Sequence, residues 1–260
     1  MGPRSTTGRD FVSTRWRERM GVKLDTVGPA SAGPGGDAMG GDVVVTPDHS
    51  VEIVSDSGEG AQKCGQIFGH VSARLGIGVW TVEYIPAEVE PPPRSIAGAS
   101  GIRIRLGDKP VTNWGDETDL VVAFNEQVLL GRHRLNALKK GATILLENMW
   151  ASHPDERIRA QWEAAMEELR EAGYRGIEVP MEDLCLTVAE NARRGKNMFA
   201  LGKLCRIFDR ELETTKDQIR KAFRKKAESV TTKNHALLQL GYDWAGENLD
   251  VRIQVPTMDA

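Results

Sequence analysis

Two runs that are apolar except for Thr143 constrain the fold of this chain more than any other feature. One is Leu120–Phe124 and the other is Ala142–Leu146, and a helical pattern lies between them. A strand that is apolar on both sides must be buried on both faces, which is typical of parallel strands covered by helices. Strand, helix and strand in this order therefore predict an α/β fold with a parallel sheet.

The rest of the chain continues this alternation. We predict a Rossmann-like, open and mostly parallel sheet with helices on both faces, together with C-terminal helices and a flexible N-terminal tail. Further strands are expected at Val51–Val54, Val79–Val82, Ile102–Leu106 and Ile177–Val179. Helices are expected before Gly76, over about residues 126–139, 155–172, 181–193 and 197–208, and after a capping box at Thr215–Gln218. The first strand, the helix before Gly76 and the second strand would form one βαβ unit.

The N-terminal residues differ from the rest in composition. Glycine, proline and small residues crowd between Gly28 and Gly41, and such a stretch cannot bury enough apolar surface to offset its ordering entropy. We predict a flexible extension over residues 1–48 and a single α/β domain with a C-terminal helical extension over residues 49–260. Phe11 and Trp16 could anchor the extension on a partner.

The bulk composition excludes several classes of protein. The net charge of -3 and the pI near 6.0 give no sign of a nucleic-acid-binding protein. No apolar run is long enough to cross a bilayer and no secretory signal pattern opens the chain, so we expect a soluble, cytoplasmic protein. The three cysteines contain no C-x-x-C pair and the five histidines show no ligand spacing, so we expect no metal or iron–sulfur cluster held by this chain alone.

One loop stands where α/β proteins bind their ligands. Ser57–Gly65 follows the first predicted strand and precedes a helix, and ligands of open α/β sheets sit beyond the carboxyl ends of the strands. Glycines allow close backbone approach, and the free N–H groups of a helix start favour a phosphate or another anion. Asn125, at the end of the strand Leu120–Phe124, offers both a donor and an acceptor at the same edge.

By spacing alone, this loop fits phosphate binding and a purely structural tight turn equally well. Lys63 stands where the dinucleotide fingerprint G-x-G-x-x-G requires glycine or alanine. The P-loop pattern G-x-x-x-x-G-K-[ST] does not occur in the chain.

Four further motifs follow the loop in a fixed order. They are Tyr84–Pro86, Ala97–Ser100 with Ile102–Arg105, Lys109–Val111 through Asp119–Phe124, and Lys196–Gly202 with the sequence KNMFALG. Together with the loop, over about residues 51–245, they resemble the gamma domain of the 2-oxoacid:ferredoxin (acceptor) oxidoreductases, and most closely the 2-oxoglutarate branch. Ala61 and Lys63 replace two glycines of the family's commonest loop, and Ala97 and Ala99 occupy an element that is usually richer in glycine.

The resemblance implies an activity shared among several subunits. In this family a 2-oxoacid such as 2-oxoglutarate or pyruvate is decarboxylated on thiamine diphosphate, with Mg. Electrons pass through iron–sulfur clusters to ferredoxin, and the acyl group passes to coenzyme A. Thiamine diphosphate, Mg and the clusters would lie on separate alpha and beta subunits, whereas a gamma chain would contact coenzyme A and support assembly of the hetero-oligomer.

The resemblance also implies which residues of this chain would contact coenzyme A, and none of them is expected to be catalytic. The candidates are the loop residues Ser57, Gly58, Glu59, Gly60, Ala61, Gln62 and Lys63, with Asn125 and Arg105, and more weakly Arg103. Glu59 could also approach the active site. Cys64 could be a low-pKa thiol at a helix start, but a small buried side chain is the interpretation that we favour.

Two other features of the sequence were considered for a functional role. The basic residues from Arg220 to Lys226 could dock an acidic ferredoxin, but the solvated face of a helix is favoured. Trp80, Trp114 and Trp150 are interpreted as packing residues of the core or of an interface.

Two other functions stay open at the level of the sequence. One is a self-sufficient Rossmann-type NAD(P)-dependent oxidoreductase, against which the missing third glycine counts. The other is a scaffold subunit without catalysis or coenzyme A contact.

Overall fold

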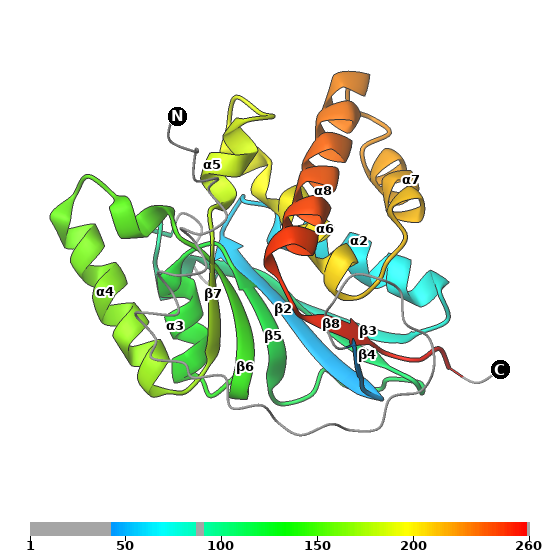
Figure 1. Ribbon diagram of the computed structural model, residues 1–260, viewed down its shortest axis with the longest axis horizontal. Coiled ribbons are helices and arrows are strands. Elements are labelled where there is room, and N and C mark those ends of the chain that lie inside the picture. The colour runs from blue at the N-terminus through cyan, green and yellow to red at the C-terminus, as the bar shows by residue number, and fades with distance from the viewer. Residues whose placement is uncertain (1–42, 87–90, 259–260) are drawn as a thin grey trace, which may run out of the picture.

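The computed structural model describes residues 43–86 and 91–258, which form a six-stranded sheet covered by helices (Figure 1). The strand order is β3-β4-β2-β5-β6-β7. The four strands β2, β5, β6 and β7 run parallel, and β4 is antiparallel to both β2 and β3. The predicted mostly parallel α/β sheet is therefore confirmed. The strands are β2 (Asp48–Asp56), β3 (Gly78–Tyr84), β4 (Ala99–Gly107), β5 (Thr118–Ala123), β6 (Leu138–Glu147) and β7 (Arg175–Val179).

The predicted βαβ unit is present in a split form. Helix α2 (Ala61–Arg74) connects β2 to β3, but β4 lies between these two strands and is hydrogen-bonded to each of them. The sequence indicates each strand but not its neighbour, because pairing depends on contacts across long chain separations. The antiparallel insertion leaves β3 at one edge of the sheet.

Helices cover the two faces of the sheet around two separate cores (Figure 1). Helices α2 and α6 (Lys196–Ile207) pack on one face, and α7 (Leu212–Ala222) and α8 (Glu228–Asn248) pack beside them. Helices α3 (Glu126–Arg134) and α4 (Glu156–Glu171) cover the other face. Within β5, Leu120 and Val122 point into the first core, and Val121 and Ala123 point into the second. This is why that run is apolar throughout.

The start of the described chain belongs to the folded domain. Val43–Val45 form β1, which pairs in parallel with β8 (Arg252–Gln254), and Asp48 already begins β2. Of the predicted extension over residues 1–48, residues 1–42 lie outside the described residues. Within the remainder, Val43–Val45 and Asp48 are in strands. The division of the chain at residue 48 stays a prediction.

Three predicted helix bounds are wrong. The helix expected over residues 126–139 ends at Arg134, because Asn136 adopts a left-handed conformation with φ of 52° and the chain enters β6 at Leu138. Gly141, with φ of 76°, therefore lies inside β6, where the pairing with β5 shifts register, and does not mark a helix end.

The helix expected over residues 181–193 is also shorter. It is α5 (Met181–Leu186), and it ends where the Thr187 hydroxyl donates to the Leu184 carbonyl, a local bond that competes with helix continuation. A short 3-10 turn at Ala192–Arg194 then leads into α6.

The capping box at Thr215–Gln218 does not open a helix. Helix α7 begins earlier, at Leu212, and Thr215 lies inside it with its hydroxyl donating to the Glu211 carbonyl oxygen at 2.9 Å. The side chain of Thr215 also contacts the Cys205 sulfur at 3.5 Å. The hydroxyl therefore links α7 to α6 and caps no N-terminus.

Candidate functional site

The turn between β2 and α2 lies at the carboxyl edge of the parallel strands. Gly58 and Gly60 both have φ of 84°, a left-handed conformation that favours glycine. A Cβ built on Gly58 would meet nothing within 4 Å, and Ser57 and Gly58 are exposed. The tip of the turn is therefore open on its outer side, with space for a ligand against the backbone.

Helix α2 begins directly behind this turn with its N-terminus uncapped by any side chain. Gly60 is the N-cap residue, no side chain accepts from the first turn, and that turn contains no acidic residue. The first N–H groups of a helix have no partner within the helix, and together with the helix dipole they favour an anion. The backbone at Ala61 and Gln62 is thus suited to a phosphate group.

Glu59 points away from the tip and into the protein. Its side chain is 8% exposed, and its Oε1 lies 3.2 Å from the Nζ of Lys196. Its Oε2 accepts from the backbone N–H of Asp56 at 3.2 Å. Burial raises the pKa of Glu59, and Lys196 partly opposes that rise. The carboxylate therefore ties the turn to α6 and does not face the open side.

The first residues of α6 and the 3-10 turn before it contact the inner side of the β2–α2 turn. A Cβ on Gly60 would overlap the side-chain amide of Asn197, and the Arg193 guanidinium donates to the Ser57 carbonyl at 3.2 Å. Lys196 is 2% exposed and also lies 3.3 Å from Glu182 in α5. Burial opposes the charged form of Lys196, but the carboxylates of Glu59, Glu147 and Glu182 raise its pKa.

Lys196 and Asn197 were not among the residues that we predicted for the site. They were quoted only as part of the motif Lys196–Gly202. The charged and amide side chains at the start of an otherwise apolar helical run were the signal that could have identified them.

A second group of polar residues holds the opposite side of the turn. The carboxylate of Asp56, the last residue of β2, accepts from the backbone N–H of Arg94 at 2.9 Å. The Arg94 guanidinium pairs with the buried Glu126 and lies 4.6 Å from the ring centroid of Trp150. The indole of Trp150 donates to the Phe124 carbonyl at 3.2 Å. The segment that carries Arg94 is thus fastened across the ends of β2 and β5.

The remaining predicted loop residues make local contacts. Gln62 donates to the Tyr84 carbonyl at 3.0 Å, and the exposed Lys63 donates to Gln66 at 2.8 Å. Asn125 is fully buried at the same edge, where its side-chain oxygen caps α3 by accepting from the Val128 N–H at 3.0 Å. The amide nitrogen of Asn125 has no protein partner.

The structure does not bring Arg105 and Arg103 together with the turn. Arg105 pairs with Ser50 across β4 and β2, six residues from the end of β2 at Asp56, or about 20 Å along the strand. Its guanidinium binds Asp48 at 2.7 Å. Arg103 is buried and pairs with Glu52 at 3.1 Å, so its charge is neutralised inside the protein.

Comparison with known proteins identifies the family of this fold. Residues 50–244 match the family model described as pyruvate ferredoxin/flavodoxin oxidoreductase. The chain belongs to this family. Among curated proteins it is 27% identical over 201 residues to the 2-oxoglutarate oxidoreductase subunit KorA of Mycobacterium tuberculosis, covering 75% of this chain and 30% of that protein.

Solved structures of the oxidoreductases share the fold. The 2-oxoglutarate:ferredoxin oxidoreductase of Magnetococcus marinus, solved with 2-oxoglutarate, coenzyme A and succinyl-CoA bound, matches with a TM-score of 0.65 at 22% identity, covering 82% of this chain and 34% of that one. The pyruvate oxidoreductase subunit PORC of Thermotoga maritima gives 0.53 at 19% identity, covering 76% and 97%. The keto/oxoacid ferredoxin oxidoreductase gamma subunit of Geobacter sulfurreducens gives 0.55 at 14% identity, covering 77% and 97%.

These relatives differ in how much of their own chain the match covers. This chain spans about a third of the M. tuberculosis and M. marinus proteins and almost the whole of the two separate subunits. The oxidoreductase family thus contains this α/β unit both within longer polypeptides and as a subunit of its own.

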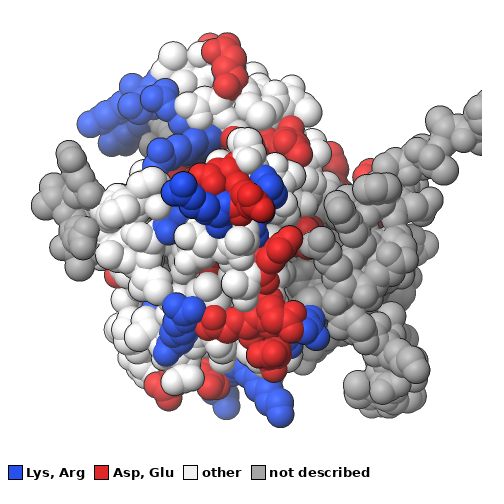
Figure 2. Space-filling model, turned by 90° about the vertical axis from the view of Figure 1, so that its left-hand side faces the viewer, with Lys and Arg blue, Asp and Glu red and all other residues white. Residues whose placement is uncertain are grey.

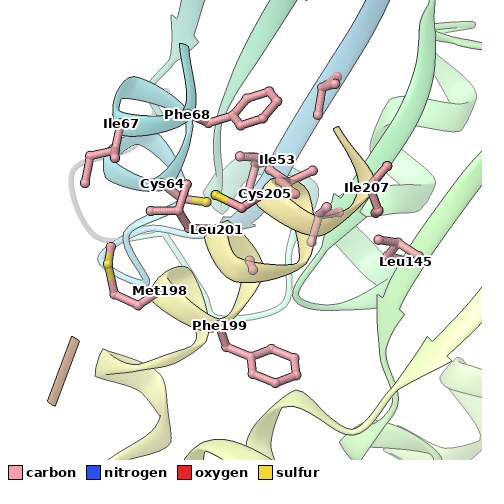
Figure 3. Packing of buried hydrophobic residues seen from close by; sticks show 14 of the residues in the cluster. Ile53, Cys64, Ile67, Phe68, Leu145, Met198, Phe199, Leu201, Cys205 and Ile207 are labelled. Carbon is pink, nitrogen blue, oxygen red and sulfur yellow. The ribbon is translucent and has the colours of Figure 1, made fainter. Parts of the chain in front are cut away.

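The cysteines of this oxidoreductase chain are all buried free thiols. Figure 3 shows Cys64 of α2 and Cys205 of α6 pointing toward each other in the core between the helices and the sheet. Burial raises the pKa of the Cys64 thiol well above its ordinary value. This agrees with the favoured interpretation of Cys64 as a packing residue.

The other candidate features lie away from the turn. Arg220 and Lys221 are exposed in the last turn of α7, and Arg224, Lys225 and Lys226 are exposed in the segment after the helix ends. Ferredoxin docking stays a prediction. Trp80 and Trp114 are 41% and 47% exposed, so they do not belong to the core of this chain. On the side of the molecule that carries α4, basic and acidic side chains are interspersed (Figure 2).

The described residues contain neither a metal-ligand cluster nor a membrane-spanning helix. No group of three or more His, Cys, Asp or Glu side chains in residues 43–86 and 91–258 could hold a metal ion. None of the helices in that part of the chain combines the length and apolar character needed to cross a membrane.

Proposed function

We propose that this chain is the gamma-type subunit of a thiamine-diphosphate-dependent 2-oxoacid:ferredoxin oxidoreductase in the cytoplasm. The complete enzyme would convert 2-oxoglutarate or pyruvate to acyl-CoA and CO₂ and reduce ferredoxin. Thiamine diphosphate, Mg and iron–sulfur clusters would be held by alpha and beta subunits. This chain would contribute the contact with coenzyme A and support assembly of the hetero-oligomer.

The open turn at Gly58, in front of the uncapped N-terminus of α2, is the observation that carries this proposal. Coenzyme A contains a pyrophosphate, and free backbone N–H groups at a helix start match such an anion without requiring a basic side chain. The nearest acidic side chain, Glu59, is turned inward and paired with Lys196, so it does not repel an anion at the tip. A ligand-bound relative of the same fold, the M. marinus enzyme, contains coenzyme A.

The proposed contacts involve fewer residues than were predicted from the sequence. The backbone of Gly58, Gly60 and Ala61 would face the pyrophosphate, and Ser57 and Lys63 are exposed beside it. The amide of Asn125 would contribute from the neighbouring strand end. Arg105 is not part of the proposal, because it lies at the opposite end of the sheet.

The test is to fill the open side of the turn without disturbing its inner side. Gly58→Ala places a methyl group where a Cβ meets nothing within 4 Å, and Gly141→Ala does the same at another left-handed glycine far from the turn. Both variants carry the same backbone strain of about 1 kcal/mol. In the native complex, we expect Gly58→Ala to raise the KM for coenzyme A and Gly141→Ala to leave it unchanged.

Other outcomes would point to other functions. An unchanged KM for coenzyme A in Gly58→Ala, with assembly intact, would reject the ligand contact and favour a scaffold subunit. Saturable binding of NAD(P)H by the purified chain, followed by fluorescence, would instead favour a dinucleotide-dependent enzyme.

A further inference from the structure

The buried pair of Glu59 and Lys196 connects the turn to α6, and it suggests a residue on which ligand binding depends. We propose that Lys196 is a positioning residue for the turn, holding the Glu59 carboxylate inward so that the backbone between Gly58 and Ala61 is open to an anion. This inference rests on the proposed coenzyme A contact and adds a residue to it.

Glu59 is held through both oxygens of its carboxylate. One carboxylate oxygen receives the backbone N–H of Asp56, the last residue of β2, and the other lies 3.2 Å from the Lys196 ammonium. The backbone N–H of Glu59 itself donates to the Asp56 carbonyl at 3.4 Å. The side chain therefore fixes the turn between the strand end and α6, and both glycines flank the residue that is held.

Lys196 supplies a countercharge for the buried carboxylate of Glu59. Without Lys196, the carboxylate of Glu59 would be buried beside the acidic Asp56 with no countercharge, and a buried unpaired charge is strongly unfavourable. The ionised carboxylate of Glu59 would then turn toward water, and the water lies on the open side of the turn. A carboxylate on that side would repel the anion that the N–H groups of α2 attract.

Lys196 is placed to act through Glu59 and not on the ligand. Its side chain is 2% exposed, and its ammonium lies between Glu59 and Glu182, 5.8 Å from the centroid of the Phe124 ring. These neighbours surround the ammonium inside the protein. The neighbouring Asn197 packs its amide against Gly60, which sets the distance between α6 and the turn.

The test uses the native complex, with coenzyme A as the varied substrate. We expect Lys196→Met to raise the KM for coenzyme A by about tenfold or more, since small displacements of a binding group have large effects, while kcat at saturation changes much less. The matched control is Lys203→Met, which removes another fully buried lysine two turns further along the same helix. It should leave this KM unchanged.

The double variant Lys196→Met, Glu59→Gln separates positioning from direct contact. A neutral glutamine can stay inside and still accept from the Asp56 N–H, so we expect the KM to return to within about threefold of the wild-type value, as coupled residues in a mutant cycle do. Lys196→Arg should also retain most of the affinity. If the double variant binds as weakly as Lys196→Met, the ammonium acts on the ligand itself and the positioning role is rejected.

A replacement variant and the comparison with Gly58→Ala separate failure of the Lys196 role from failure of the coenzyme A contact. If Lys196→Met does not assemble, Lys196→Gln is measured in its place, because it also removes the countercharge of Glu59, and an unchanged KM in that variant would overturn the proposal. If Gly58→Ala does not affect the KM, the coenzyme A contact itself fails. If Gly58→Ala raises the KM but Lys196→Met does not, only the role of Lys196 fails.

Discussion

Gly202 of α6 lies directly against the backbone carbonyl of Leu238 in α8, so closely that a Cβ at residue 202 would overlap the oxygen atom. The contact is reciprocal one turn away, where Gly241 of α8 lies against the carbonyl of Phe199 in α6. The two helices therefore cross backbone to backbone. This explains the glycine at the end of the motif Lys196–Gly202 as a packing requirement.

We expect Gly202→Ala to lower the free energy of unfolding by about 1–3 kcal/mol, because an added methyl in a packed contact forces the backbone to move. Urea unfolding of the full-length chain would measure this. Gly246→Ala in α8 is the control. Its Cβ would meet only the flexible Arg206 side chain, at 3.2 Å, and alanine favours a helix by up to about 1 kcal/mol. Equal stability of Gly202→Ala and the wild type would contradict the close crossing.

Asn125 is expected to contribute to stability through its cap. Asn125→Ala removes the acceptor for the Val128 N–H and should cost about 1 kcal/mol in the free energy of unfolding, whereas Asn125→Ser, which keeps a neutral capping acceptor, should retain most of it. Asp155→Ala, which removes the cap of α4, is a control for the loss of a cap away from the turn. A KM for coenzyme A that rises in Asn125→Ala but not in Asp155→Ala would support the proposed ligand contact. Equal KM values would limit Asn125 to capping.

We expect the free energy of unfolding to depend on pH because of the buried Lys203. Burial lowers the pKa of Lys203 to about 7, and its ammonium has no hydrogen-bond partner. Between about pH 7 and the ordinary lysine value of 10.5, the unfolded chain binds more protons than the folded chain, so the free energy of unfolding should rise with pH across that window.

The corresponding variant is Lys203→Met. It should be more stable than the wild type by about 1–4 kcal/mol at pH 6, because a well-packed apolar side chain replaces a buried charge, and the difference should shrink toward pH 10. Lys140→Met, at an exposed lysine, should show no such trend. A stability difference that stays the same across this pH range would mean that folding leaves the pKa of Lys203 at its ordinary value.

The three thiols should be unreactive in the folded chain. Burial raises the pKa of Cys64, that of Cys185 to about 12 and that of Cys205 to about 11. Since the thiolate is the reactive form, iodoacetamide at pH 8 should leave all three unmodified until the chain is denatured. Mass spectrometry of the labelled chain would show this. Modification of Cys64 in the folded protein at the rate of a free thiol would revive its interpretation as a reactive residue.

The sequence by itself determined the elements that rest on local patterns. The apolar run Leu120–Phe124 and the run Ala142–Leu146, apolar except for Thr143, predicted two buried strands, because burial on both faces favours apolar side chains at nearly every position. The glycines around Glu59 located the turn, because a left-handed backbone favours a residue without a Cβ. The ordered motifs over the chain indicated the family, which the family match over residues 50–244 confirms.

Only the tertiary structure decided how these pieces meet. The insertion of β4 between β2 and β3, the distance of Arg105 from the turn and the pairing of Glu59 with Lys196 all join residues far apart in the chain. Such contacts depend on which surfaces the packed helices and strands bring together, and no local pattern encodes them. The sequence placed Lys196 just before a predicted helix, and the fold buries it as the countercharge for Glu59 beneath the turn.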